Sequence, residues 1–265
     1  MLFSLRGQLP KRTKLIIELV GSVLFLSLWL LLTEYPIVRP SILPSPLKVI
    51  STFGEMHYND ALLRNAGYSF YLNTLGLIEA AVLALPLGLL KIFPIFRSAF
   101  ERYVTSARFL PLTAVVGLFI LWFGIDSNMK VQFLAFSIFL FLLPMVIQRV
   151  DEVEEVYVQT VKTLGATKWQ TIRTVFIPSV VSRVFDDIRV LAAVSWTYIV
   201  VAELVNSSGG GIGALCYIAS RMSRVDKVFG ILVVIILIGF VQDRSLVYLD
   251  KKLFAYKYAC DSHGK

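Results

Sequence analysis

Few residues in this chain have the types and spacing that catalysis or metal binding requires. The histidines are His57 and His263 and the cysteines are Cys216 and Cys260, and these four form no Cys/His/carboxylate cluster with the spacing of a metal site. The glycine-rich stretch "SSGGGIG" at 207–213 lacks the Lys-Ser/Thr that completes a phosphate-binding loop. We therefore expect no catalytic residues, no bound metal, no cofactor and no nucleotide site in this chain.

Polar side chains inside long apolar stretches are the best candidates for contact with a solute. They are Asn73, Glu79, Trp196 and Glu203. A carboxyl at membrane depth costs several kcal/mol unless it faces protein or water. Glu79 is therefore either held neutral or hydrogen-bonded between helices, or it lines a cavity and contacts the solute. For Trp196 the alternatives are packing and recognition, and for Glu203 we favour a gating or structural hydrogen bond.

The elements that position these side chains follow from composition. The chain is 57% hydrophobic and 17% charged, with a mean hydropathy of +0.73, whereas globular domains carry roughly 25% charged residues. Runs of about 20 apolar residues can cross a bilayer as helices. The sequence predicts an all-α membrane protein with six transmembrane helices, at about 15–33, 66–90, 104–124, 130–149, 186–206 and 227–248.

The distribution of basic residues predicts the orientation. With a cytoplasmic N-terminus, 19 Lys and Arg fall on the cytoplasmic side and 7 outside, as the positive-inside rule requires. Both termini are thus expected in the cytoplasm, and the net charge of +8 indicates a lipid bilayer as partner, with no nucleic acid. The expected division is a cytoplasmic segment 1–14, a first transmembrane helix 15–33, an extracytoplasmic connection 34–65, a five-helix core 66–250 with a cytoplasmic loop 150–185, and a cytoplasmic tail 251–265.

The stretch "LGATKWQTIRTVFIPS" at 164–179 lies in that cytoplasmic loop. Apolar residues three or four apart place one apolar face on a helix, Gly165 interrupts the pattern, and Pro178 is expected to end it. We expect two short helices joined at an angle at Gly165. Such short helices are marginal alone, so the segment either lies on lipid headgroups or docks on a soluble partner.

This segment resembles the E-A-A-x3-G-x9-I-x-L-P loop of the permease subunits of ATP-binding-cassette importers. Gly165, Val175, Ile177 and Pro178 take the last four motif positions, whereas residues 159–161 are Gln-Thr-Val instead of Glu-Ala-Ala. The stretches "ILPSPLKVI", "LPLGLL", "ILWFGI", "SWTYIVVAEL" and "GGGIG", over roughly 40–255, are similar to the nitrate/sulfonate/taurine branch of these permeases.

The resemblance implies a type I importer permease fold in a prokaryotic inner membrane, working as a dimer with a second copy or paralogue. The implied partners are an ATPase subunit dimer, which supplies the hydrolysis, and an extracytoplasmic binding protein. The residues expected to couple to the ATPase are Leu164, Gly165, Ala166, Thr167, Lys168, Trp169, Ile172 and Pro178. The implied cargo is a small polar solute, namely a sulfonate, a nitrate-like anion or a heterocyclic vitamin precursor.

Two other function classes fit the sequence less well. A secondary transporter or channel would normally show inverted repeats or an ion-coupling site, and Glu79 is the one feature of the sequence that points to such a site. A membrane-embedded enzyme needs catalytic residues at one depth, and no such cluster is present. Small residues in the second span, including Gly76, Ala80 and Ala84, permit close helix contact either within the chain or between copies.

Overall fold

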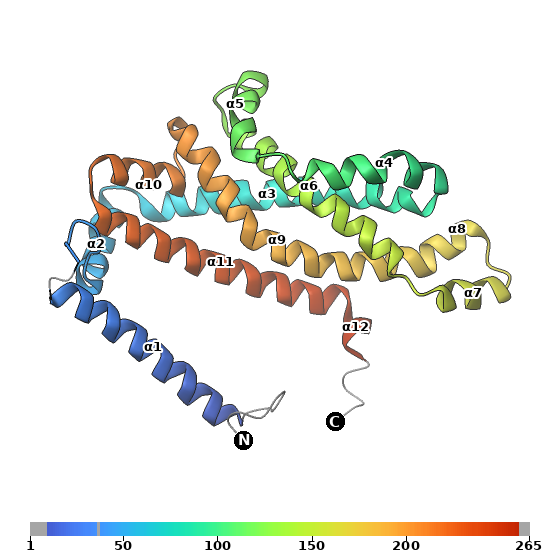
Figure 1. Ribbon diagram of the computed structural model, residues 1–265, viewed down its shortest axis with the longest axis horizontal. Helices are drawn as coiled ribbons and strands as arrows, with labels where there is room; N and C mark the ends of the chain where they lie inside the picture. The colour runs from blue at the N-terminus through green and yellow to red at the C-terminus, as the bar shows by residue number, and fades with distance from the viewer. Residues whose placement is uncertain (1–9, 36–37, 260–265) are drawn as a thin grey trace. The chain divides into compact units, whose positions relative to one another are not determined.

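The computed structural model describes residues 10–35 and 38–259, and in these ranges the regular structure is entirely helical (Figure 1). Cys260 and His263 lie outside the described residues. Five described helical stretches are long and apolar enough to cross a membrane, and a shorter apolar helix follows the second of them. The all-α membrane fold expected from the sequence is therefore confirmed.

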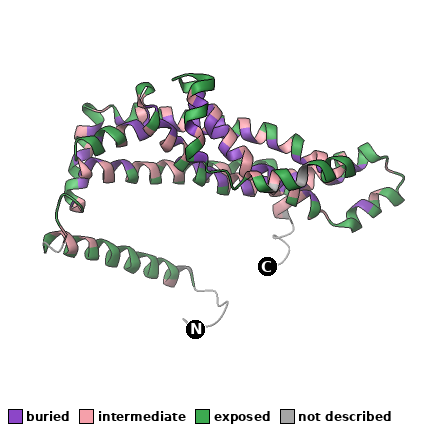
Figure 2. Cartoon of the chain, turned by 45° about the horizontal axis from the view of Figure 1, so that its top comes forward, coloured by how far each residue is buried: buried purple, intermediate pink, exposed green. Residues whose placement is uncertain are grey.

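The chain divides into two compact units, each described by itself. The first contains residues up to 62 together with 218–233. It includes α1 (Lys11–Glu34), α2 (Pro46–Tyr58) and the beginning of α11 (Val225–Leu253). Almost every apolar side chain of α1 is exposed (Figure 2), as expected of a helix whose surroundings are lipid. The indole of Trp29 donates a hydrogen bond to the Pro44 carbonyl at 3.0 Å and packs on Phe229.

Two basic side chains fasten α2 to the start of α11. Arg224 Nη2 lies 2.7 Å from Glu55 Oε2, and Lys227 Nζ lies 2.9 Å from Glu55 Oε1. Lys227 also donates to Asp60 at 2.6 Å. The hydrogen bonds from Arg224 and Lys227 lower the pKa of Glu55 from 4.5 to about 2. In this clasp of Glu55, Arg224 and Lys227, two basic residues of an expected outer loop pair with acidic neighbours.

The second unit contains residues 63–217 and 234–265. It holds α3 (Leu62–Leu89), η1 (Leu90–Ile92), α4 (Pro94–Ala107), α5 (Leu112–Phe123), α6 (Ser127–Asp151), α7 (Glu155–Thr163), α8 (Lys168–Thr171), the π-helix η2 (Ile172–Phe176), α9 (Ile177–Val205), η3 (Ser207–Gly209), most of α10 (Ile212–Arg221), the rest of α11, and α12 (Ala255–Ala259). Helices α6 and α9 pack extensively against each other in this unit. Its apolar core includes Val116 and Phe119 of α5, Met129 and Phe133 of α6, and Ala202 of α9.

The third expected span has different bounds in the structure. A helix was expected over 104–124, but α4 ends at Ala107 and α5 begins at Leu112. Pro111 explains the break, because proline has no N–H to donate and disfavours helical backbone in the residue before it. The 12 residues of α5 rise about 18 Å, less than the roughly 30 Å of a hydrocarbon core.

Small residues on α3 face α6 within the chain. Ala80 and Ala84 are fully buried. A Cβ added to Gly76 would lie 2.7 Å from Leu134 Cδ2, and one added to Gly88 would lie 2.7 Å from Val146 Cβ. The stripe at positions 76, 80, 84 and 88 thus lets two helix backbones approach closely. Packing within the chain therefore accounts for the small residues noted in the sequence.

We predict that Gly88→Ala destabilises the protein and Gly67→Ala does not. Val146 is β-branched and stiff, so the new methyl forces helix movement, at a cost of about 1–3 kcal/mol for overpacking. Gly67 lies on the same helix with nothing within 4 Å of an added Cβ, so it controls for helix propensity. Thermal unfolding in detergent measures both, and equal melting temperatures would contradict this packing.

The Glu55 clasp predicts a dependence on pH. Because the pKa of Glu55 is depressed to about 2, its stabilising effect is complete above pH 4.5 and is lost as the pH falls from 4.5 towards 2. Hydrogen exchange of α2 amides, corrected for intrinsic rates, should show protection falling over this range. Glu55→Gln should be less protected at pH 5 and change little on acidification. An identical pH profile in the two proteins would refute the clasp.

Candidate functional site

The bend expected at Gly165 is a left-handed helix cap. Gly165 has φ +81°. Its N–H donates to the Lys162 carbonyl at 2.9 Å, and the Ala166 N–H donates to the Val161 carbonyl at 3.0 Å, which is the bonding of a Schellman motif. Residues with a Cβ are strained at this φ. A Cβ here would meet nothing within 4 Å, so the requirement for glycine is set by the backbone and not by crowding.

The next helix begins directly after this cap. Thr167 and Gln170 form a capping box, in which the Thr167 hydroxyl accepts from the Gln170 N–H at 3.3 Å and the Gln170 side chain accepts from the Thr167 N–H at 2.8 Å. Two devices therefore fix one sharp turn: a cap that ends α7 and a cap that starts α8. The turn lies at one end of the second unit (Figure 1).

The expectation that Pro178 ends the helix is wrong. Lys168–Val205 forms one uninterrupted helical stretch of 38 residues, and Pro178 lies in the first turn of α9. The π-helical turn η2 at Ile172–Phe176 explains the exception, because its wider bonding accommodates a proline that lacks an N–H and would otherwise clash one turn back. The segment at 168–171 is thus the tip of a transmembrane helix.

The tip presents apolar side chains that nothing in its unit covers. Leu164 is 82% exposed and Trp169 67% exposed, and Val156 and Tyr157 on α7 are also exposed. Ile172 is half-buried, whereas Gly165, Thr167 and Lys168 are exposed and Ala166 is half-buried. Trp169 is therefore free for contact, whereas Ile172 packs partly within the protein itself. We call Leu164–Ile172 together with α7 the α7–α8 knob.

The base of the knob is held by groups that sequence reasoning missed. The Tyr256 hydroxyl of α12 donates to the Pro178 carbonyl at 2.9 Å, and Lys257 Nζ lies 2.6 Å from Asp186 Oδ2. Arg149 of α6 makes a bidentate pair with Asp187 at 2.7 and 2.9 Å. These contacts tie α6 and α12 to the N-terminal half of α9.

At the opposite end of the unit, Glu203 is the centre of a buried polar cluster. Its side chain is fully buried and accepts from the Ser69 hydroxyl at 2.6 Å and from the Gly213 N–H at 2.8 Å. Lys130, also fully buried, donates to the Gly210 carbonyl at 2.9 Å and interacts electrostatically with Glu203. The glycine-rich loop is therefore an ordered part of this cluster, which joins α3, α6 and α9.

Two members of this cluster were not expected from the sequence. Lys130 was counted among the seven basic residues outside, at the start of the span expected from 130, but it is fully buried in the first turn of α6. Asn65 accepts from the Gly211 N–H at 2.8 Å, and Gly211, with φ +112°, has no room for a Cβ beside the Glu203 carboxylate. The glycines that follow Glu203 in the sequence could have indicated this cluster, because a backbone that packs closely against a carboxylate requires glycine.

Asn73 and Trp196 belong to a second network, deeper in the unit. Asn73 Oδ1 accepts from Ser195 at 2.9 Å and from Gln242 at 3.2 Å, while the Trp196 indole donates to Gln242 Oε1 at 2.7 Å. Asn73 is fully buried and Trp196 is 5% exposed. Trp196 and Gln242 also line a pocket of about 340 Å³ with Arg189. The structure thus places Asn73 between helices and Trp196 at a pocket wall.

Glu79 has a different environment. Both of its carboxylate oxygens accept from the Gln132 amide, at 2.8 and 3.1 Å, and both residues are half-buried. The pair lies between two pockets of about 450 and 310 Å³, each of which it lines. Among the four expected path residues, Glu79 is the carboxyl that the structure leaves accessible from a cavity.

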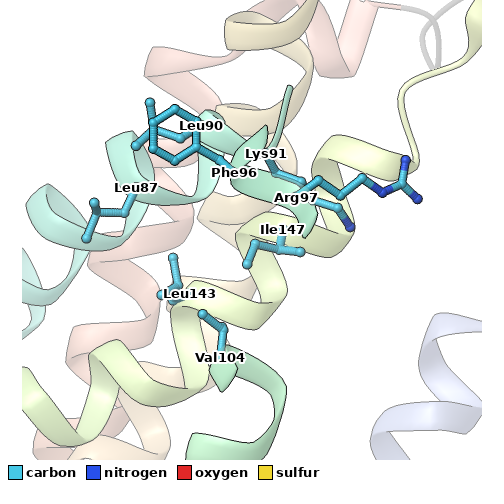
Figure 3. A pocket seen from close by; sticks show the side chains of 8 residues that line it. All are labelled: Leu87, Leu90, Lys91, Phe96, Arg97, Val104, Leu143 and Ile147. Carbon is cyan, nitrogen blue, oxygen red and sulfur yellow. The ribbon is translucent and has the colours of Figure 1, made fainter. Parts of the chain in front are cut away.

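A further pocket of about 250 Å³ lies between η1, α4 and α6 (Figure 3). Its walls are mainly apolar, and Lys91 and Arg97 stand at one edge (Figure 3). Lys91 pairs with Asp151 at the end of α6. Glu79 does not line this pocket, so it is separate from the candidate path.

Comparison with known families identifies the protein family of this chain. Residues 80–255 match the family model described as binding-protein-dependent transport system inner membrane component. This chain belongs to that family. The match covers the knob, α9 and most members of both polar networks, whereas Asn65, Ser69, Asn73 and Glu79 lie before its first residue.

Individual relatives agree with this assignment. The permease is 27% identical over 236 residues to the putative aliphatic sulfonates transport permease protein SsuC of Bacillus subtilis, covering 88% of this chain and 84% of that protein. It is 24% identical to the taurine transport system permease protein TauC of Escherichia coli, covering 94% and 92%. Inward-facing structures of the MetNI methionine ABC transporter contain a chain with the same fold, at a TM-score of 0.64 and 16% identity, covering 72% of the permease and 95% of that chain.

Family membership establishes the general role. The chain is a multi-pass inner-membrane permease subunit of an ATP-binding-cassette importer with the type I fold, in the sulfonate and taurine branch expected from its sequence. It works with an ATPase and a substrate-binding protein, and ATP is hydrolysed in partner chains.

The buried cluster at Glu203 predicts a clear stability effect. Glu203→Ala leaves the Ser69 hydroxyl and the Gly213 N–H without their acceptor and Lys130 without its counter-charge, so it should cost about 3–5 kcal/mol. Glu203→Gln, which keeps one acceptor, should cost less, and adding Lys130→Met to Glu203→Ala should recover part of the loss. Thermal unfolding should separate these from the exposed control Glu154→Ala; equal stability of the two alanine variants would contradict the cluster.

Proposed function

We propose that the α7–α8 knob is the element through which a separate ATPase drives this permease. The observation that carries the proposal is the exposed apolar pair Leu164 and Trp169, of which Trp169 lies at the start of a helical stretch long and apolar enough to span a membrane. Exposed aromatic side chains with a polar surround are typical anchors of protein interfaces, and Lys168 and Arg173, both exposed, supply the polar rim.

The helix geometry favours docking on protein over lying on headgroups. A surface helix needs an apolar face along its length, whereas here the apolar groups stand at the tip of a bent helix that enters the membrane core. Closure of two ATPase subunits would push two such tips, and α9 would carry the movement to α6 and α12 through the Arg149–Asp187 and Lys257–Asp186 pairs. Such rigid-body switching between inward-facing and outward-facing states needs no deformation of the helices.

We propose further that two permease chains, identical or paralogous, form the translocation path around a two-fold axis. An extracytoplasmic binding protein delivers a small polar solute, of the sulfonate, nitrate-like or heterocyclic vitamin precursor kind. Support comes from the relatives named for sulfonates and taurine. In this proposal Glu79 lines the path, whereas Asn73, Trp196 and Glu203 hold the helices that form it.

The proposed orientation places the knob and both termini in the cytoplasm. The end of the second unit that carries the knob also carries Lys91, Arg149, Arg183 and Lys257, which supports the positive-inside prediction.

Substitution of Gly165 tests the coupling role. Gly165→Leu places a Cβ residue at φ +81°, which costs about 1–3 kcal/mol of local strain and should disrupt the bend while leaving the spans inserted. We expect loss of ATPase co-purification and of solute uptake in the cells that natively make the importer. Gly165→Asn is the matched control, because asparagine tolerates this φ, and should retain at least half of both. Full uptake by Gly165→Leu would refute the proposal.

A further inference from the structure

The Glu79–Gln132 pair lies beside an aromatic wall. The pocket of about 310 Å³ that the pair lines is also lined by five aromatic side chains: Phe119, Trp122, Phe123, Phe136 and Phe139. They come from α5 and α6, and the pocket is completed by Leu83 and Leu87 of α3 and Ala135 of α6. A carboxyl and an amide at the edge of an aromatic cavity form an arrangement that general packing of membrane helices does not require.

The aromatic wall is held in place by ring contacts. Phe119 is 5% exposed, and its ring centroid lies 5.4 Å from Phe136, 5.6 Å from Trp122 and 5.7 Å from Phe123. These separations are within the range of favourable ring pairs. Trp122, by contrast, is 66% exposed. The wall thus has a fixed base at Phe119 and an accessible indole, which suits stacking against a flat molecule or a cation.

The polar side of the pocket is rich in acceptors. The Gln132 amide donates to both Glu79 oxygens, which leaves the carboxylate with further lone pairs and the Gln132 carbonyl oxygen as an additional acceptor. Neither pocket beside Glu79 is lined by Lys or Arg. An anionic group placed here would meet a carboxylate and no balancing cation, whereas a group with several N–H donors would meet complementary acceptors.

We infer that this cavity selects a small, flat, nitrogen-rich solute that carries N–H donors or a positive charge, such as an amidinium or an aminoheterocycle, over a simple sulfonate. The inference rests on the proposed function, because it assumes that Glu79 lines the path. A cavity near the lower end of the roughly 300–1,000 Å³ typical of ligand sites fits a molecule of one or two rings. The relatives named for sulfonates would then differ from this permease in cargo.

Two probes with the same ring but opposite charge test the inference. Benzamidine carries an amidinium and benzenesulfonate a sulfonate, so the benzene ring and its hydrophobic contribution are matched. Binding of each to the full-length permease in nanodiscs is measured by saturation-transfer NMR, with empty nanodiscs as background. We expect benzamidine to bind at least tenfold more tightly than benzenesulfonate. Equal affinity, preference for the sulfonate, or no binding of benzamidine would overturn the inference.

Variants locate the binding. Glu79→Gln, which keeps size and hydrogen bonding but removes the charge, should weaken benzamidine at least tenfold, and Trp122→Leu should weaken it several-fold. The matched controls are the exposed residues Glu154→Gln and Trp169→Leu, which should leave binding unchanged. Unaltered benzamidine binding in Glu79→Gln, with an unchanged melting temperature, would also overturn the inference. No ATPase is present in this assay, so its failure leaves the coupling role of the knob standing, and loss of coupling in the Gly165 variants does not affect it.

Discussion

Inside a membrane-spanning bundle, every polar group that cannot reach water must find a partner in the protein, and most of this structure follows from that constraint. Glu203 and Lys130 are met by Ser69 and by backbone groups of the glycine-rich loop. Deeper in the unit, Ser195 and Gln242 donate to the Asn73 carbonyl oxygen and Trp196 donates to Gln242, while the Asn73 amide nitrogen is buried without a partner among the described residues. These contacts specify which helices are neighbours and in which register, because the apolar faces alone would pack in many ways.

The two regions for which a function is proposed are those whose side chains are not fully paired or buried within the chain. The α7–α8 knob leaves Leu164 and Trp169 exposed, and the Glu79–Gln132 pair lines two cavities. The first is an apolar surface, for which we propose a protein partner. The second is a polar site, for which we propose a ligand with hydrogen-bond donors. One helix pair, α6 and α9, connects them through the second unit, since α9 carries the knob and α6 carries Gln132.

The sequence predicted the parts of this arrangement that depend on local pattern or on a motif with fixed spacing. Continuous apolar runs predicted the long helices, and the motif placed Gly165 at a bend that the left-handed cap explains. Local rules failed where tertiary contact overrides them. Pro178 was expected to end a helix, but the π-helical turn before it accommodates the proline. Lys130 was counted among the outer basic residues, because nothing local in the sequence shows that it donates a hydrogen bond to the carbonyl of residue 210. Gln132 was missed for the same reason, since its partner lies 53 residues away.

We propose above all that the ATPase binds at the start of the helical stretch Lys168–Val205, where Trp169 lies. Photo-crosslinking tests it most directly, with benzoylphenylalanine incorporated in place of Trp169 or, as a control of equal chemistry, in place of Trp122. Irradiation in the cells that natively make this importer should produce an adduct with the nucleotide-hydrolysing subunit from position 169 and none from position 122. A lipid adduct alone from position 169, or equal ATPase adducts from both positions, would contradict the account.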